Sequence, residues 1–277
     1  MAADLRPEVI EAALRGRFGR PLRSFESVGS TNDVALDWAA AGAPEGAVVV
    51  ADHQTSGRGR RGRRWLDPDQ AGSRFDGTAD QIGSLLMFSL ILRPSGGLAG
   101  LSLLTTAAGV ACAEAVEGLT GLDVKLKWPN DVMLDGRKLA GILVESRAGA
   151  DAVDVAVLGC GVNVDWAEDA MPDELAGRAV SLSARSSRVP TRPELLAAVL
   201  VSFEHLYPRI ADRSGAEELI RAAEARSAIL GEVVAVRFPD GSSVRALARR
   251  LLPNGALELD CDGVARVVEA ADIEQIR

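Results

Sequence analysis

Hydrophobic and polar positions in this chain repeat with two different periods, which predict two kinds of element. Residues 124–128 alternate strictly between apolar and lysine side chains, so we expect Val124, Leu126 and Trp128 on one face of a strand. Residues 98–119 repeat apolar side chains at helical spacing and predict a long amphipathic helix. Short apolar runs predict further strands at 47–51, 84–92 and 154–158.

Capping residues set the limits of several helices. Ser30 is a good N-cap for a helix that Gly42 and Pro44 end. The tetrapeptide Thr191-Arg192-Pro193-Glu194 combines a capping threonine, an early proline and a glutamate three residues on. It predicts a helix that runs to about residue 207. Shorter helices are expected over residues 8–17 and 214–227.

Two connecting segments have distinct compositions. Asp135-Gly136 lies between apolar runs at 132–134 and 138–145, which is a strong signal for a hairpin. Residues 66–83 are rich in Gly, Asp, Ser and Gln and show no periodicity. We expect them to form a loop that orders over a ligand.

The pattern changes near residue 231, where short β-type segments begin to alternate with turns. These turns are Pro239-Asp240-Gly241, Pro253-Asn254-Gly255 and Asp262-Gly263. They predict a small barrel of four or five strands. The sequence therefore predicts an α+β chain with a mixed domain over residues 1–228 and a small all-β domain over residues 229–277.

Composition narrows the functional classes. Hydrophobic residues make up 47% of the 277 positions and charged residues 25%, which is ordinary for a soluble globular protein. The three cysteines form no CxxC pair, and with only two histidines they argue against a disulfide framework or a zinc site. Charges begin within the first residues and no apolar run reaches membrane-spanning length, so we expect a cytoplasmic protein without membrane attachment.

The segment at residues 57–65 stands out because it holds five arginines in a chain of formal net charge −8. Guanidinium groups match phosphate geometry, and glycines between them let the backbone approach a ligand. A nucleic-acid patch and a solvated loop are the alternatives. A small anionic ligand is favoured because nucleic-acid patches usually lie in basic proteins.

Five segments that follow in order along the chain carry a family resemblance. They are Gly29-Ser30-Thr31-Asn32, the run from Gln54 to Arg63, Lys127-Trp128-Pro129-Asn130-Asp131, the run from Arg137 to Glu145, and Gly159-Cys160-Gly161-Val162-Asn163. Together they closely resemble the biotin–protein ligases, specifically the short type without an N-terminal DNA-binding domain. The resemblance covers nearly the whole chain.

The resemblance implies a class II synthetase-like catalytic domain, a mixed sheet with flanking helices, followed by an SH3-like β-barrel. It implies ATP-dependent activation of biotin to biotinyl-5′-AMP and transfer to a lysine of the biotin carboxyl carrier domain of acyl-CoA carboxylases. ATP would bring Mg²⁺, for which no ligand set is assigned, and a homodimer is one option for the assembly.

The resemblance also assigns roles to individual residues. Lys138 and Arg60 are the expected catalytic cations, because they can neutralise two anions that repel each other. Asp131 is expected either to orient the acceptor lysine or to hold magnesium. The expected biotin contacts are Ser30, Thr31, Asn32, Gln54, Gly57, Arg58, Gly59, Arg60, Trp128, Lys138 and Gly141. The expected nucleotide contacts are Arg58, Arg60, Arg63, Trp65, Asn130, Lys138, Asn163 and Arg277, with Trp65 stacking on adenine once the loop orders.

Other functions stay open at this point. A lipoate–protein ligase would share the fold, and a non-catalytic biotin-binding module would share the pocket. Residues 1–28 are shorter than a winged-helix domain of roughly 60 residues, so we expect an enzyme without nucleic-acid partners or a repressor role. A nucleic-acid-binding protein would instead show a steep salt dependence of binding.

Overall fold

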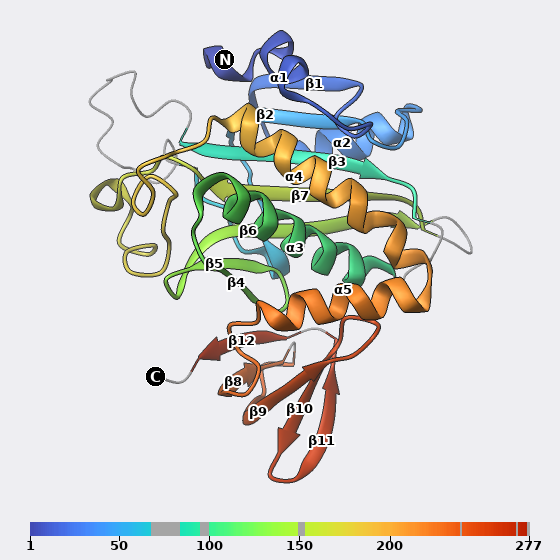
Figure 1. Ribbon diagram of the computed structural model, residues 1–277, viewed down its shortest axis with the longest axis vertical. Helices are drawn as coiled ribbons and strands as arrows, with labels where there is room; N and C mark the ends of the chain where they lie inside the picture. The colour runs from blue at the N-terminus through green and yellow to red at the C-terminus, as the bar shows by residue number, and fades with distance from the viewer. Residues whose placement is uncertain (68–83, 95–99, 149–152, 239, 270, 276–277) are drawn as a thin grey trace.

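Two β-sheets organise the chain (Figure 1). The computed structural model describes residues 1–67, 84–94, 100–148, 153–238, 240–269 and 271–275. The larger sheet has seven strands in the order β1-β2-β3-β7-β6-β5-β4. Strand β1 is parallel to β2 and the other described neighbours are antiparallel, so the sheet is mixed as predicted. Within these ranges, no helix has the length and apolar character needed to cross a membrane.

The strands of the larger sheet agree with most of the sequence pattern. They are β1 (Leu22–Val28), β2 (Val48–Gln54), β3 (Leu85–Leu92), β4 (Val124–Lys127), β5 (Asp131–Leu134), β6 (Arg137–Ala148) and β7 (Val153–Asn163). The hairpin between β5 and β6 is confirmed, with Asp135 and Gly136 at φ angles of 49° and 72°. Strand β7 is longer than predicted because it continues through the glycines of the 159–163 segment. The loop expected over residues 66–83 lies almost wholly outside the described residues.

Helices cover both faces of this sheet. They are α1 (Pro7–Ala13), α2 (Thr31–Ala40), α3 (Gly100–Thr120), α4 (Arg192–Leu206) and α5 (Arg213–Ala225). Side chains of α1, α3, α4 and α5 share one buried core with the sheet. Figure 1 shows α3 and α4 in front of the same face, with α5 below the β4 edge. Helix α2 covers the other face, where its alanines pack on β2, β3 and β7.

The two predicted helix caps have different outcomes. The capping box of α4 is present, because the Thr191 hydroxyl accepts from Glu194 N–H and the Glu194 carboxylate accepts from Thr191 N–H. Ser30 stands at the N-cap position of α2 as expected, but its side chain makes no capping hydrogen bond. It is buried instead, which leaves its hydroxyl for another task.

The second sheet is antiparallel and has its own core. Its strands are β8 (Val233–Arg237), β9 (Ser243–Leu251), β10 (Leu257–Cys261), β11 (Val264–Val268) and β12 (Asp272–Gln275). Their order is β11-β10-β9-β8-β12, and a buried cluster that includes Val234, Leu257 and Ile273 lies within them. The predicted run of five short strands is confirmed, whereas the SH3-like barrel and the domain limit at residue 228 stay predictions.

The two sheets meet around the turn that follows β4. Trp128 lies in this turn, so its predicted place on a strand face with Val124 and Leu126 is wrong: β4 ends at Lys127. The Trp128 ring packs against the core of the second sheet, and its indole N–H donates to the Gly255 carbonyl at 3.0 Å. An aromatic ring with a polar edge suits this junction between an apolar cluster and a backbone turn.

Candidate active site

A cleft of about 760 Å³ opens on the α2 side of the larger sheet, where β6 and β7 carry glycines instead of side chains. Gly141 pairs with Gly161 across these strands, and Gly159 pairs with Leu143. A methyl group at Gly161 would lie 2.6 Å from the Trp65 ring, and one at Gly159 would lie 2.3 Å from the Asn32 amide oxygen. The glycines therefore form a floor on which these two side chains rest, and the expected approach of the Gly141 backbone to a ligand stays a prediction.

One end of the cleft is polar but carries no charge. Ser30, Thr31, Asn32 and Gln54 line it, and each is at least nine-tenths buried. Thr31 donates to the Gln54 amide oxygen from its backbone N–H at 2.7 Å and from its hydroxyl at 3.1 Å. The Ser89 hydroxyl lies 2.6 Å from the Asn32 amide oxygen. Such a set of neutral donors and acceptors suits an uncharged polar ligand group.

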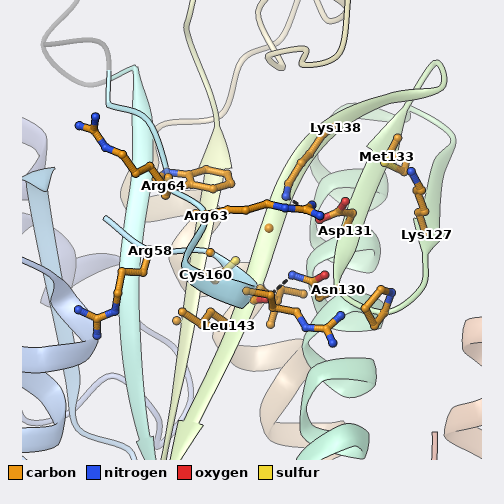
Figure 2. A pocket seen from close by; sticks show the side chains of 18 of the residues that line it. Arg58, Arg63, Arg64, Lys127, Asn130, Asp131, Met133, Lys138, Leu143 and Cys160 are labelled. Atoms are coloured by element: carbon orange, nitrogen blue, oxygen red, sulfur yellow. Dashed lines mark hydrogen bonds and ion pairs between the residues drawn. The ribbon is translucent and has the colours of Figure 1, made fainter. Parts of the chain in front are cut away.

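Lys138 defines the charged end of the cleft. Its ammonium pairs with the Asp131 carboxylate at 2.6 Å, and Figure 2 shows the two side chains facing each other. Its backbone is also fixed, because Lys138 N–H donates to Arg178 carbonyl at 2.8 Å and its own carbonyl accepts from Val180 N–H at 3.0 Å. The ammonium lies 5.5 Å from the centre of the Trp65 ring, within cation–π range. Lys138 is therefore a positioned cation.

The arginine-rich segment, residues 57–65, forms a small hairpin that lines the cleft. We call it the arginine loop. Arg58 and Arg64 form an isolated antiparallel bridge, and Gly59 N–H donates to the Arg63 carbonyl at 2.7 Å. The turn needs left-handed backbone at Arg61 (φ 56°) and Gly62 (φ 70°). These backbone contacts and φ angles therefore define the shape of the arginine loop.

Carboxylates of the protein neutralise three of the loop's arginines. Arg58 forms a bidentate ion pair with Asp33, with N···O distances of 2.6 and 2.7 Å. This pairing raises the pKa of Arg58 and lowers the pKa of Asp33. Arg61 and Arg63 both pair with Asp272 of the second sheet. Figure 2 shows Arg58 directed away from Lys138. Arg58 nevertheless lines the cleft, and its expected contact with a bound anion stays a prediction.

Arg60 differs from these three arginines. Its guanidinium lines the cleft and makes no hydrogen bond or ion pair with any residue in the described ranges. Burial lowers the pKa of Arg60, because desolvation penalises the charged form. A partly buried cation without a carboxylate partner is a good binding group for an anionic ligand.

The two tryptophans occupy different parts of the cleft wall. The Trp65 ring lies on Gly141 and Gly161, and its buried indole N–H lacks a hydrogen-bond partner among the described residues. Its expected stacking on adenine stays a prediction. Trp128 lines the cleft and also packs against the core of the second sheet. Trp65 therefore forms the floor between the neutral and charged ends.

Some of the remaining predicted site residues line the cleft and others do not. Asn130 lines the cleft and donates its amide to the Ile142 carbonyl at 2.8 Å. Asn163 is not among the lining residues; its amide donates to the Lys138 and Val180 carbonyls and so supports the strand that carries Lys138. Gly57 also lies behind the lining, where a methyl group would come 2.8 Å from the Trp65 carbonyl. Arg277 lies outside the described residues.

The structure adds site residues that sequence reasoning missed. Asp33, Glu145 and Asp272 are the acidic partners of the arginine loop, and Arg178 lines the cleft beside Lys138. Glu145 closes the motif that begins at Arg137, so the motif itself was a usable signal. Nothing in the local pattern around Asp272 distinguishes it from other acidic residues.

Candidate metal ligands are sparse. Within the described ranges no group of three or more His, Cys, Asp or Glu side chains is arranged to hold an ion. The carboxylates that line the cleft in those ranges are Asp131 and Asp272. Asp131 pairs with Lys138, and Asp272 pairs with Arg61 and Arg63.

The mixed sheet, the glycine floor, the positioned lysine and the arginine loop together define a small-molecule site in the cleft of an α+β protein. The Biotin/lipoate A/B protein ligase family model matches residues 24–163, and the chain belongs to this family. The resemblance inferred from the motifs is thus confirmed.

Known relatives in this family match this chain over different shares of its length. The biotin–[acetyl-CoA-carboxylase] ligase of Mycobacterium tuberculosis is 36% identical over 99% of this chain and 98% of its own length. The bifunctional ligase/repressor BirA of Bacillus spizizenii is 38% identical over 68% of this chain, which spans only 54% of that relative. Biotin protein ligase from Aquifex aeolicus, solved in complex with biotin and ATP, superposes with a TM-score of 0.75 at 26% identity and covers 93% of this chain and 100% of that one.

Proposed function

We propose that this protein is a biotin–[acetyl-CoA-carboxylase] ligase, which activates biotin with ATP and transfers the biotinyl group to a carrier lysine. The observation that carries the proposal is the pairing of a neutral polar end with two cations, Lys138 and Arg60, across one cleft. Biotin has the matching order of groups, with a neutral ureido ring at one end and a carboxylate at the other.

The orientation of biotin follows from this polarity. Its ureido ring hydrogen-bonds the neutral end formed by Ser30, Thr31 and Gln54, where a charged group would lack a counter-ion. Its apolar ring and chain lie along Trp65 above the glycine floor, because that part of the cleft offers aromatic surface. Its carboxylate then reaches the ammonium of Lys138.

Adenylation joins two anions, so charge neutralisation is the main task of the site. An oxygen of the biotin carboxylate attacks the α-phosphorus of ATP, a bond to that phosphorus forms, and the bond to the β-phosphate breaks to release pyrophosphate. Lys138 bridges the carboxylate and the α-phosphate, and Arg60 stabilises charge on the phosphate oxygens. Their fixed positions also hold the reacting groups together, which removes much of the entropic cost of the encounter.

Transfer uses the same cleft. The neutral amine of a lysine on a biotin carboxyl carrier domain attacks the acyl carbon of biotinyl-5′-AMP. An amide bond forms, the acyl–phosphate bond breaks, AMP leaves and the amine gives up its proton. The arginine loop keeps water from the activated acid until the carrier arrives. The names of the full-length relatives support acyl-CoA carboxylases as the source of the carrier.

ATP brings Mg²⁺ as its counter-ion, and the carboxylate at the charged end of the cleft that would hold it is Asp131, which also pairs with Lys138. A carboxylate suits this hard cation, which usually binds proteins through one or two carboxylates together with substrate phosphates. When bound, the ion neutralises phosphate charge. We further propose that the enzyme works in the cytoplasm and has no repressor role, since a net charge of −8 disfavours binding to DNA.

A direct assay tests the proposal. Purified protein, ATP, Mg²⁺, biotin and a carrier domain should yield a carrier whose mass rises by one biotinyl group on its acceptor lysine. ATP–pyrophosphate exchange with biotin or with lipoate as the acid separates the two branches of the family. Exchange that depends on lipoate alone would reject the biotin assignment, and no exchange with either acid would reject the enzyme.

A further inference from the structure

The arginine loop is held to the body of the protein by carboxylates on both of its sides. We propose that Asp33 and Asp272 are positioning residues that keep the arginine loop closed over the cleft, and that Arg58 serves this closure instead of contacting a phosphate. The expected kinetic consequence rests on the proposed ligase function. The closure itself does not.

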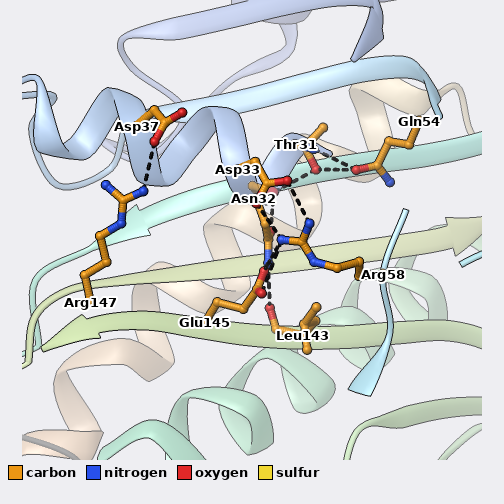
Figure 3. A network of polar contacts seen from close by, with 10 residues as sticks. Thr31, Asn32, Asp33, Asp37, Gln54, Arg58, Leu143, Glu145 and Arg147 are labelled. Atoms are coloured by element: carbon orange, nitrogen blue, oxygen red, sulfur yellow. Dashed lines mark hydrogen bonds and ion pairs between the residues drawn. The ribbon is translucent and has the colours of Figure 1, made fainter. Parts of the chain in front are cut away.

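The first contact joins the arginine loop to helix α2. The Arg58 guanidinium donates to both carboxylate oxygens of Asp33, at 2.7 and 2.6 Å (Figure 3). It also lies 3.2 Å from the Glu145 carboxylate on β6. Glu145 in turn accepts from the Asn32 amide at 2.7 Å. The position of the arginine loop is therefore linked to a side chain at the neutral end of the cleft.

The second contact joins the same loop to the second sheet. Asp272 is the first residue of β12, and one of its carboxylate oxygens accepts from Arg61 at 3.0 Å and also from Arg63. Asp272 is only 18% exposed, and it lines the cleft itself. Arg58 lies at one end of the loop and Arg63 near the other. The ion pairs with Asp33 and Asp272 therefore hold the hairpin at two separate points.

The arginines of the loop therefore differ in their contacts. Three of them satisfy protein carboxylates, whereas Arg60 lies between the two contacts and pairs with none of the described residues. Fastening its neighbours fixes the backbone of Arg60 and so presents its guanidinium to a ligand. The contacts are partly exposed, and exposed ion pairs are weak. They can hold the loop closed while still letting it open for substrate.

Helix α2 offers a matched control. Asp37 lies one turn beyond Asp33 and pairs with Arg147 of β6 at 2.8 Å, also visible in Figure 3. Asp37→Asn removes the same charge from the same helix and breaks one ion pair, but it leaves the arginine loop untouched. Any general effect of losing an acid from α2 should appear in both variants.

Hydrogen exchange of the whole chain without ligands tests the closure. The reporters are the amides of Gly59 and Trp65, which donate within the loop hairpin to the Arg63 and Gly57 carbonyls. Asp33→Asn and Asp272→Asn should each speed exchange in residues 57–65 by roughly two- to fivefold, as loss of a partly exposed pair allows. Asp37→Asn should leave the rate in those residues unchanged. Unaltered exchange in the first two variants, or equal acceleration in the third, would overturn the proposal.

A second measurement tests the consequence for catalysis. Asp33→Asn and Asp272→Asn should release more free biotin and AMP per biotinyl group transferred, because an open loop admits water to the activated acid. Asp37→Asn should keep the ratio of the unaltered protein. Faster exchange without added leakage would overturn the positioning role. If the unaltered protein forms no adenylate, the proposed function fails, while the exchange result still decides whether these aspartates close the loop.

Discussion

Lys138 is the residue on which the proposed chemistry depends most. Its ammonium is fixed by Asp131 and its backbone by the segment around Arg178, so the charge is placed before any ligand binds. We expect Lys138→Ala to lower ATP–pyrophosphate exchange by about 10²–10³-fold, the usual cost of removing one preorganised donor. Biotin affinity should change little, because the neutral end of the cleft is left intact.

A lysine outside the cleft provides the control for this variant. Lys125 of β4 pairs with Asp123 near the surface, and Lys125→Ala should keep exchange within about twofold, as exposed pairs contribute little. Exchange that survives in Lys138→Ala within a few-fold would contradict the role assigned to Lys138.

Asp33 is the carboxyl group through which the arginine loop acquires a pH dependence. The hydrogen bonds from Arg58 lower the pKa of Asp33 in the folded protein. For a carboxyl group with a lowered pKa, the stabilisation is complete above the ordinary value of about 3.9 and is lost as the pH falls through the folded value. Carboxyl-carbon NMR should therefore show Asp33 titrating below that ordinary value. Arg58→Gln should move the midpoint upward, and an unmoved midpoint would remove the pairing as the cause.

At the scale of elements, the glycine floor of β6 and β7 decides what fits in the cleft. A methyl group at Gly161 would lie 2.6 Å from the Trp65 ring, so the ring would have to move away from the sheet, toward the cleft that it lines. We expect Gly161→Ala to displace this ring at a cost of about 1–3 kcal/mol, the usual range for overpacking. Calorimetric titration with biotin should then show markedly weaker binding. Unchanged affinity would mean that Trp65 does not contact the vitamin.

The same substitution should have the opposite effect in helix α3. Gly118 lies in this helix with open space around its α-carbon. Gly118→Ala should stabilise the protein by about 0.4–1 kcal/mol, because alanine loses less conformational freedom on folding. A rise in the midpoint of thermal unfolding, with adenylation unchanged, is the expected result. A lower midpoint would indicate a contact that the present packing does not show.

Sequence reasoning succeeded for elements whose signals are local. The α4 capping box, the Asp135-Gly136 hairpin and the turns of the second sheet all depend on residues within a few positions of one another. Strand β1 was missed because Leu22–Val28 is an edge strand with mixed burial, and its parallel partner β2 lies more than 20 residues away.

The difference between local signals and long-range contacts also explains which features of the site were predicted from the sequence. Motifs identified Lys138, Arg60 and the neutral end of the cleft, since each belongs to a short run with a recognisable composition. They did not predict which arginines would be neutralised. Asp272 lies over 200 residues from Arg61 in sequence, and only the packing of the second sheet brings the two together. A charge cluster in a sequence therefore shows where cations gather, and the fold decides which of them remain available.

At the scale of the whole molecule, the two sheets have separate cores but share the cleft. The main core is built almost entirely from residues before 228, whereas Asp272 and Ile273 contribute one wall of the cleft from the second sheet. A chain truncated after residue 228 should therefore fold, with the circular dichroism of a mixed α+β protein and a single unfolding transition. It should bind biotin within about tenfold of the full chain, because the neutral end is retained.

The truncated chain should instead lose adenylation, which takes place at the charged end of the cleft. Without Asp272 the arginine loop loses the ion pairs that join it to the second sheet, and the cleft wall opens beside Arg60. We expect ATP–pyrophosphate exchange to fall by more than about 100-fold, because positioning and water exclusion are lost together. Full exchange by the truncated chain would show that the second sheet is dispensable for adenylation. An unfolded product would show instead that residues 1–228 do not form an independent domain.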